Sequence, residues 1–441
     1  MKVDLIVTDI GQLVTCASPD GPKRGRAMTD AGIIDNGAVA INGGKFVAVG
    51  SSDEIARDHQ SENIIDARGR VVCPGFVDPH THIVFAGERL DEFELKIKGA
   101  DYLEILSNGG GIISTVQKTR EELADFLVAD GNMRIEKMGA CGTTTIEVKT
   151  GYGLDLESEL KMLRVIFEMD KMRSHSCTLV PTVLAAHAVP PEFRGRTDDY
   201  VDLICEQILP QAKKYYDDFT HFPGCGIPIF ADVFCEKNAF DLRQSRRVLE
   251  TAKNLGYGIK AHVDEFTNLG GSRMAIEMGA TSIDHLDAIS DREIEMLANS
   301  ETVGVITPTV NFNFGSPEFA DARKMIDAGC AIALSTDFNP GSAPCPSQPM
   351  VMAIACRYQK LLPAEAMNAA TINAAHAIGL GERFGSIEIG KEADLVFLDA
   401  ADYREVCYEF GGTLVSKVVK GGREVYNKND GNYPRRRESN V

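Results

Sequence analysis

Between residues 70 and 345 the sequence alternates two kinds of segment. Short runs rich in β-branched residues are followed by longer amphipathic stretches, and the pattern repeats eight times. Eight parallel strands with intervening helices are the number that closes a (β/α)8 barrel, so we predict an α/β fold of this TIM-like type. The predicted strands are Val71 to Val77, Thr143 to Val148, Thr178 to Ala185, Ile229 to Phe234, Gly258 to Val263, Thr281 to His285, Thr302 to Pro308 and Ala331 to Thr336.

Helical periodicity lies between the predicted strands. Each helical stretch ends near a glycine or another small residue before the next apolar run, as connections from helix to strand commonly do. An open, doubly wound sheet would show the same alternation, so the choice between the two folds depends on which strands carry the functional residues. The clearest helical stretches are Glu121 to Met138, Leu156 to Met172, Asp241 to Leu255 and Gly271 to Met278.

Both ends of the chain have a different character. Near the N-terminus, residues 3–10, 37–50 and 63–72 read as strands separated by glycine-rich or Asn-Gly turns. Residues 393–399 and 416–426 near the C-terminus share this pattern. We therefore predict a small β-sandwich-like domain formed by residues 1–70 and 386–441, which flanks a barrel of residues 71–385.

Composition and charge restrict the partners of the protein. A chain of 441 residues that is 44% hydrophobic and 25% charged can bury a large core. Its formal net charge of -18 opposes nucleic acid and anionic membrane surfaces, and the single basic run, Arg435 to Arg437, reads as a solvated tail. The 11 cysteines include no C-x-x-C pair, and the N-terminal segment does not read as a signal peptide. No segment approaches the length of about 20 apolar residues that a membrane-spanning helix needs. We expect a cytoplasmic protein with reduced thiols.

Five histidines follow predicted strands or lie near their ends. In a parallel barrel the functional face lies at the C-terminal ends of the strands, so a polar residue that ends an apolar run is a candidate site residue. A single histidine at such a position is more often an ordinary core or surface residue. Five histidines at such positions are too many for all of them to be ordinary core or surface residues. They are His80, His82, His187, His262 and His285.

Four residues form a set suited to one divalent metal ion. His80 and His82 are two residues apart, so on an extended backbone they face the same way, and His262 and Asp337 can complete a site for Zn²⁺ or Fe²⁺. Such an ion activates water, which predicts hydrolysis. Asp337 could instead cap the turn that follows it. Candidate residues from the first, fifth, sixth and eighth strands meet naturally only if the sheet closes, which favours the barrel.

Hydrolysis at a carbon bonded to nitrogen also needs groups that move protons. Glu265 and His285 are placed to share this work, with the division between them left open. Glu265 could equally be a solvated loop carboxylate, and His285 could orient another residue.

Two further side chains could bind an anionic small molecule. Arg89 lies soon after the histidine pair and could hold a substrate carboxylate, or it could form a surface ion pair with Glu88 or Asp91. Tyr152 could hydrogen-bond a substrate or pack at the mouth of the barrel.

The residues together resemble the amidohydrolase superfamily, which has H-x-H after strand one, a histidine on strands five and six, and an aspartate on strand eight. Within it the chain resembles the imidazolonepropionase family over nearly its whole length. The segments that carry this resemblance include PGFVDPHTHIVFAGERLDEFELKIKGADYLEI, GGGIISTVQKTR, TTTIEVKTGYGL, AAHAVPPEF, ADVFCE, HVDEFTNLGGSRMAIEMGATSIDHL and STDFNPGS.

This resemblance implies hydrolytic opening of 4-imidazolone-5-propanoate to N-formimidoyl-L-glutamate, in histidine degradation. It also implies a homodimer with one divalent metal per chain. Glu236 raises the question of a second metal, because some relatives in the superfamily bridge two. By the same likeness the metal ligands would be His80, His82, His262 and Asp337, and the substrate-binding residues Arg89, Tyr102, Tyr152, His187, Glu265, Asn339, Gly341 and Ser342. The catalytic residues that we expect are Glu265, His285 and Asp337.

Two competing functions remain at this stage. A deaminase acting on a nucleobase or a related cyclic amidine would use nearly the same ligands, and Arg89 is the residue that discriminates between the two reactions. A catalytically silent barrel that serves as a scaffold would have no reason to retain the full ligand set. A metal analysis separates the scaffold from both enzymes.

Overall fold

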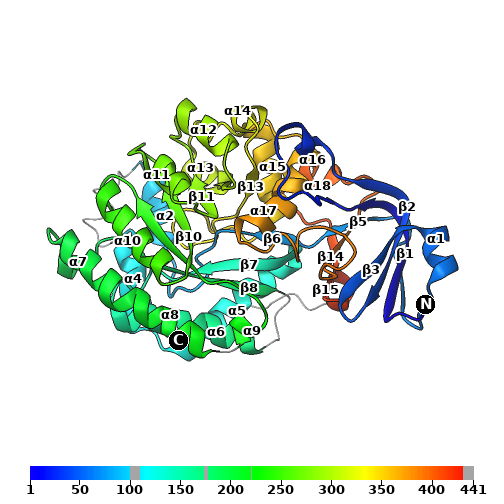
Figure 1. Ribbon diagram of the computed structural model, residues 1–441, viewed down its shortest axis with the longest axis horizontal. Helices are drawn as coiled ribbons and strands as arrows, with labels where there is room; N and C mark the ends of the chain where they lie inside the picture. Colours follow the sequence, from blue (N-terminus) through cyan, green and yellow to red (C-terminus); the bar gives the residue numbers. More distant parts are fainter. Residues whose placement is uncertain (100–109, 173–176, 220, 431–441) are drawn as a thin grey trace.

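The computed structural model describes residues 1–99, 110–172, 177–219 and 221–430. Eight strands in this part of the chain form one parallel sheet in which each strand pairs with the next one in sequence (Figure 1). The predicted barrel is confirmed. Its strands are β6 (Phe76–Asp78), β7 (Thr143–Lys149), β8 (Thr178–Ala186), β9 (Phe230–Cys235), β10 (Gly258–Val263), β11 (Ser282–His285), β12 (Val303–Ile306) and β13 (Ile332–Leu334).

The first and last barrel strands meet just beyond their C-terminal ends. Thr81 forms a parallel bridge with Phe338, and the backbone N–H of His82 donates to the Phe338 carbonyl at 3.0 Å. The Asp78 carboxylate adds a side-chain link, because it accepts a hydrogen bond of 2.5 Å from the Ser335 hydroxyl. These contacts close the sheet, so the alternative of an open, doubly wound sheet is wrong.

Helices surround the barrel strands (Figure 1). All four helical stretches expected from periodicity are confirmed, as α5, α6, α10 and α11. No helix in the described ranges is long and apolar enough to cross a membrane. The helices of this layer are α2 (Leu90–Ile97), α4 (Ile112–Glu121), α5 (Ala124–Ala140), α6 (Leu156–Met172), α7 (Thr197–Leu203), α8 (Leu209–Asp218), α9 (His221–Gly224), α10 (Leu242–Asn254), α11 (Gly271–Glu277), α12 (Asp291–Ala298), α13 (Pro308–Phe314), α14 (Ala322–Asp327), α15 (Gln348–Tyr358), α16 (Pro363–Ala369) and α17 (Ile372–Ala377).

The run from Val71 to Val77, expected to be one strand, is two strands in different sheets. Its first half, β5 (Val71–Pro74), pairs with β1 (Leu5–Val14) and with β14 (Leu395–Leu398) from the other end of the chain. The chain crosses to the barrel at Gly75, where an added Cβ would lie 2.1 Å from the Thr144 hydroxyl oxygen. A residue without a side chain is needed at this close approach.

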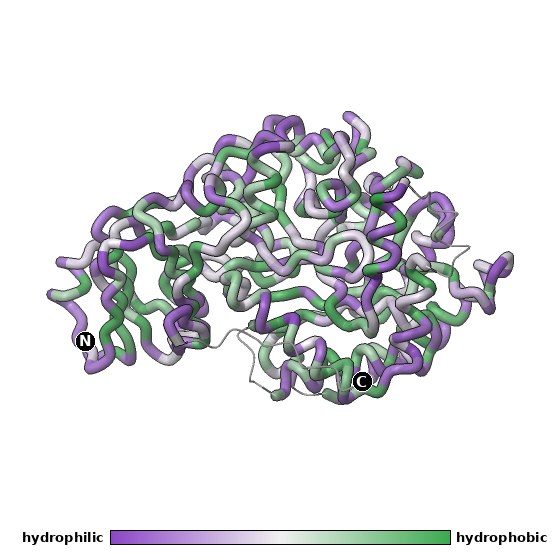
Figure 2. Tube along the Cα trace, turned by 180° about the vertical axis from the view of Figure 1, so that it is seen from behind, coloured by the Kyte–Doolittle hydropathy of each residue, from purple (hydrophilic) through white to green (hydrophobic). Residues whose placement is uncertain are grey.

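The strands from both chain ends form one mixed sheet in the order β16-β15-β14-β5-β1-β2-β3, with β4 beside β1. This sheet has a hydrophobic core of its own, formed by buried residues of β1, β2, β5, β14 and β15 among others. Figure 2 shows these strands mainly in green. The remaining elements are β2 (Ile33–Asn42), β3 (Lys45–Ser51), β4 (Ile64–Asp66), β15 (Val415–Lys420), β16 (Arg423–Asn427), α1 (Ser52–Asp58) and α18 (Glu405–Tyr408).

The domain boundaries at residues 70 and 385 stay a prediction, and two contacts bear on them. Strand β5 belongs to the mixed sheet, as described above. In addition, the Asn373 side-chain amide donates to the backbone carbonyl of Lys23 and accepts from its N–H, so part of the N-terminal segment docks on the barrel helix α17. The mixed sheet and the barrel are therefore joined by more than one segment of chain.

Candidate active site

His80 and His82 lie in the turn that follows β6, and both side chains are buried. Their Nε2 atoms are 3.3 Å apart. Thr81, between them, donates its hydroxyl hydrogen to the Glu147 carbonyl at 2.6 Å and pairs with Phe338. Thr81 is thus fixed both to β7 and to the segment that follows β13, and the two imidazoles beside it lie edge to face with ring centroids 5.2 Å apart.

Asp337 joins this pair from the segment after β13. Its Oδ1 lies 3.5 Å from His80 Nε2 and 3.4 Å from His82 Nε2. Ligand atoms about 2.0–2.2 Å from a tetrahedrally coordinated ion lie roughly 3.3–3.6 Å from one another. The three atoms therefore have the spacing of ligands around one metal ion.

His262 on β10 and His285 at the end of β11 complete the cluster. The ligand atoms of His80, His82 and His262 lie within 4.8 Å of one another, as do those of His80, His285 and Asp337. Among the described residues, both ring nitrogens of His262, Nε2 of His285 and Oδ1 of Asp337 are buried without a hydrogen-bond partner. Buried polar atoms normally have partners, and a cation would supply one, so these residues fit a divalent metal ion.

Electrostatics favour the same interpretation. Burial, with nearby cationic groups, holds the pKa of His80, His82 and His285 well below its usual range, so these imidazoles are neutral and can bind a metal. Burial also raises the pKa of Asp337 well above its usual range. A divalent cation beside this carboxyl group would favour its ionised form.

Buried carboxylates contact the other ring nitrogens of two histidines. Asp284 Oδ2 lies 2.6 Å from His80 Nδ1, and Asp232 Oδ2 lies 3.0 Å from His262 Nδ1. Sequence reasoning missed both aspartates. The available signal is that each stands inside an apolar barrel strand, one of them directly before His285.

Glu265 and His285 face each other beside the cluster. Glu265 Oε2 lies 3.9 Å from His285 Nε2, and His285 Nδ1 lies 3.1 Å from the Thr307 hydroxyl. Burial, reinforced by the charge of Asp337, raises the pKa of Glu265 well above its usual range. Glu265 is therefore not a solvated loop carboxylate, and its carboxyl group can carry a proton near neutral pH.

Tyr152 and His187 stand next to His82. The His187 ring stacks on the His82 ring with centroids 5.0 Å apart, and the Tyr152 ring centroid lies 5.9 Å from that of His82. His187 Nδ1 lies 3.0 Å from the Gly151 carbonyl, and burial lowers the pKa of His187 to about 3. Both side chains are thus close enough to the cluster to contact a molecule bound there.

Arg89, immediately before α2, is anchored by Thr115 and by Gly341. Its Nε donates to the Thr115 hydroxyl at 2.9 Å, and an added Cβ on Gly341 would lie 2.2 Å from its Nη1. A surface ion pair with Glu88 or Asp91 is the alternative that the sequence leaves open for Arg89. Instead the nearest carboxylate is that of Glu92, 3.7 Å from Nη1, and the arginine side chain is only 12% exposed.

Asn339, Gly341 and Ser342 form the loop against which Arg89 packs. Asn339 Oδ1 accepts hydrogen bonds of 2.8 Å from the N–H groups of Gly341 and Ser342, and Asn339 Nδ2 donates to the Asp337 carbonyl at 2.7 Å. This loop therefore links the position of Arg89 to that of Asp337.

Tyr102 and Glu236 are the remaining residues that the sequence singled out. Tyr102 is outside the described residues. Glu236 accepts hydrogen bonds of 2.9 Å from the N–H groups of Phe266 and Thr267, so its carboxylate anchors the loop after Glu265. This engagement disfavours Glu236 as a ligand of a second metal.

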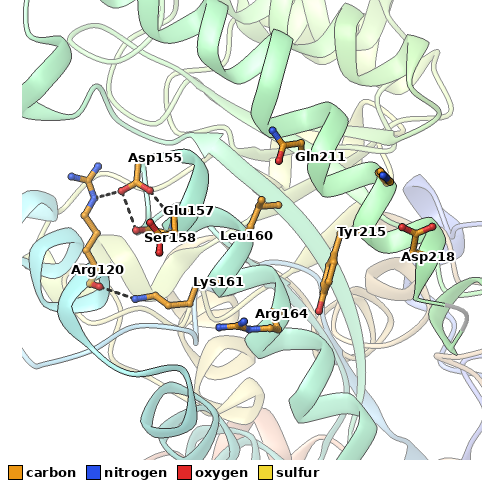
Figure 3. Close-up of a pocket in the computed structure, with 11 residues that line it drawn as sticks. Arg120, Asp155, Glu157, Ser158, Leu160, Lys161, Arg164, Gln211, Tyr215 and Asp218 are labelled. Atoms are coloured by element: carbon orange, nitrogen blue, oxygen red, sulfur yellow. Dashed lines mark hydrogen bonds and ion pairs between the residues drawn. The ribbon is translucent and has the colours of Figure 1, made fainter.

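A separate groove of about 950 Å³ lies on the outside of the barrel, between α6 and α8 (Figure 3). None of the candidate residues within the described ranges lines it. Figure 3 shows Arg120 paired with Asp155, at 2.9 Å, and Lys161 bonded to the backbone carbonyl of Arg120. The groove therefore offers no cluster comparable to the one at the barrel mouth.

Models of the Amidohydrolase family match residues 246–425 and 63–104. The chain is 53% identical to the imidazolonepropionase of Chloroflexus aggregans, covering 96% of this chain and 98% of that protein. It is 46% identical to the imidazolonepropionase of Symbiobacterium thermophilum, covering 96% and 97%.

Among solved structures, guanine deaminase of E. coli covers 96% of this chain and 99% of its own, with a TM-score of 0.69 and 16% identity. An adenosine deaminase of Xanthomonas campestris with bound zinc covers 96% of this chain and 93% of its own, with a TM-score of 0.68 and 18% identity. At these identities the two deaminases support the fold alone. The curated relatives are far closer, and they show that the chain belongs to the imidazolonepropionase family of the amidohydrolases.

Proposed function

We propose that this enzyme opens the ring of 4-imidazolone-5-propanoate by metal-dependent hydrolysis, which yields N-formimidoyl-L-glutamate in histidine degradation. The observation that carries the proposal is the set of three ligand atoms at mutual distances of 3.3–3.5 Å, with buried imidazole nitrogens of His262 and His285 beside them. A site of this kind has room for one divalent ion, and a mixed nitrogen and oxygen set suits either Zn²⁺ or Fe²⁺.

Arg89 is proposed to hold the propanoate group of the substrate. Its planar guanidinium can bind a carboxylate with two parallel hydrogen bonds. Thr115 and Gly341 fix its orientation, and the loop from Asp337 to Ser342 links it to the metal ligands. The imidazolone ring would then lie between this arginine and the histidine cluster, next to Tyr152 and His187.

Glu265 and His285 are proposed to move the protons of the reaction. When bound, the metal ion lowers the pKa of water and polarises the ring carbonyl. Breaking the ring C–N bond leaves a nitrogen that must take up a proton, and Glu265, whose pKa is raised by burial, can supply it. His285, 3.9 Å away and neutral, can accept a proton from the attacking water or relay it to Glu265.

The test is an absorbance assay of imidazolone consumption together with a metal analysis. Purified protein should contain about one Zn or Fe per chain, and a chelator should abolish turnover. Arg89→Ala should raise KM strongly, whereas Arg57→Ala, at an exposed ion pair with Asp58, should leave KM unchanged. Turnover of a cyclic amidine such as guanine but not of the imidazolone would establish a deaminase instead.

The assembly and location of the enzyme are part of the same proposal. We expect a homodimer in the cytoplasm, because the imidazolonepropionase family implies the dimer and the pattern of cysteines suits a reducing compartment. No two cysteines in the described part of the chain are joined by a disulfide. Light scattering of the purified protein would show the mass of one chain or of two.

A further inference from the structure

Five charged side chains are buried in the interior of the barrel, next to the metal-site histidines. Glu147 and Lys149 lie on β7, Asp232 on β9, Lys260 on β10 and Asp284 on β11, and all five side chains have no exposed area. Burying charged groups is costly unless they are paired closely. Their arrangement therefore calls for a reason beyond packing.

Lys149 connects the two carboxylates that contact metal-site histidines. Its Nζ lies 2.7 Å from Asp232 Oδ2 and 3.6 Å from Asp284 Oδ2. The same two oxygen atoms face ring nitrogens: Asp232 Oδ2 lies 3.0 Å from His262 Nδ1, and Asp284 Oδ2 lies 2.6 Å from His80 Nδ1. One ammonium group thus connects histidines from the first and fifth barrel strands.

Each carboxylate is also held at its second oxygen. Asp284 Oδ1 accepts a hydrogen bond of 2.6 Å from the Ser282 hydroxyl, and Asp232 Oδ1 accepts one of 2.7 Å from the Val233 N–H. A carboxylate at Nδ1 favours the imidazole tautomer with the proton on that nitrogen, which leaves Nε2 free to bind a metal.

We propose that Lys149 is a positioning residue for the metal site. It fixes Asp232 and Asp284, and these two carboxylates hold the imidazoles with Nε2 free. Lys260 is not equivalent to it. Its Nζ donates to the Pro79 carbonyl at 2.6 Å and lies 3.7 Å from Asp284, and none of its ion pairs among the described residues includes Asp232.

The first test measures metal affinity rather than turnover, and it rests on the metal site of the proposed function. With the full chain freed of metal, competition against a chelator gives the dissociation constant for Zn²⁺. Lys149→Met should weaken Zn²⁺ binding by about 10- to 100-fold and change the visible absorption of the Co²⁺-loaded protein. Lys391→Met is the matched control, because Lys391 is also buried and its Nζ bonds to the Gly381 carbonyl and the Ser386 hydroxyl, away from the metal site.

A second variant separates positioning from simple charge balance. Glu147→Gln with Lys149→Met restores the net charge of the interior but not the bridge between the two aspartates. Zn²⁺ binding should stay weak in this double variant, and recovery of wild-type affinity would overturn the proposal.

If Lys149→Met does not fold, Asp232→Asn and Asp284→Asn test the same bridge, and each should weaken Zn²⁺ binding. Wild-type affinity with an unchanged Co²⁺ spectrum in any of these folded variants would refute the positioning role alone. A wild-type protein that binds no Zn²⁺ would refute the proposed function as well.

Discussion

Gly341→Ala isolates the contribution of the arginine that we propose to bind the substrate carboxylate. The added Cβ would lie 2.2 Å from Arg89 Nη1 and 2.8 Å from its Cζ. The backbone of Gly341 is outside the left-handed region, so alanine is tolerated by the chain itself. The substitution therefore acts almost entirely through the arginine.

The size of the effect follows from the displacement. The guanidinium must move by more than about 1 Å, because the new methyl group would start 2.2 Å from Nη1 and ordinary van der Waals contact begins at 3.4 Å. Such a movement breaks the 2.9 Å hydrogen bond from Arg89 Nε to the Thr115 hydroxyl. A misplacement of about 1 Å at a substrate-positioning group costs roughly 100-fold in rate, or about 2.7 kcal/mol. We expect this loss in kcat/KM, mainly through a higher KM.

Steady-state kinetics with the imidazolone would measure the change, and the bound metal should remain at the wild-type level. Gly412→Ala is the control, because its added Cβ would meet no atom within 4 Å and its φ is not positive. If Gly341→Ala had the same KM as the wild type, Arg89 would not be the group that binds the substrate carboxylate.

Three further predictions concern the proton shuttle, the metal and acid stability. Glu265→Gln should lower kcat by about 10²- to 10⁴-fold while the metal content stays unchanged, as kinetics and metal analysis on one sample would show. Removal of the metal should lower the thermal midpoint, because a ligand at about 1,000 times its dissociation constant stabilises the folded state by about 4 kcal/mol. Burial and the charge of Lys391 lower the pKa of His376 from 6.5 to about 4. Because protonation then favours the unfolded chain, the free energy of unfolding should fall by up to about 1.4 kcal/mol per pH unit as the pH drops from about 6.5 to 4. His376→Asn should flatten this slope in chemical denaturation.

The barrel could be predicted from the sequence because its signal is periodic. The helices α5, α6, α10 and α11 begin and end within three residues of their predicted bounds. The error at Val71 to Val77 has a physical cause. A buried strand of the mixed sheet and a buried strand of the barrel are equally apolar, so hydrophobicity cannot reveal that the chain changes sheets at Gly75.

The buried charges were the harder part of the site to predict. Glu147, Lys149 and Lys260 lie at alternate positions of strands that are buried on both faces, where charged residues are rare. That rarity could have marked them. Their partners could not be deduced, because an ion pair between β7, β9 and β11 depends on how the barrel closes rather than on spacing along the chain.

Backbone conformation explains why strand alternation alone could not place the reactive side chains. His285 has a φ of 84° and Asp337 a φ of 47°, both in the left-handed region that non-glycine residues rarely adopt. Each ends or follows a barrel strand, so the chain turns there and the side chain leaves the alternating pattern of the strand. Such conformations cost of order 1–3 kcal/mol each and persist only where surrounding contacts impose them. The contacts are present: Asn339 donates to the Asp337 carbonyl, and the Thr307 hydroxyl meets His285 Nδ1. The strained backbone at the end of β11 therefore turns His285 toward the histidine cluster. The strained backbone after β13 turns Asp337 toward the same cluster.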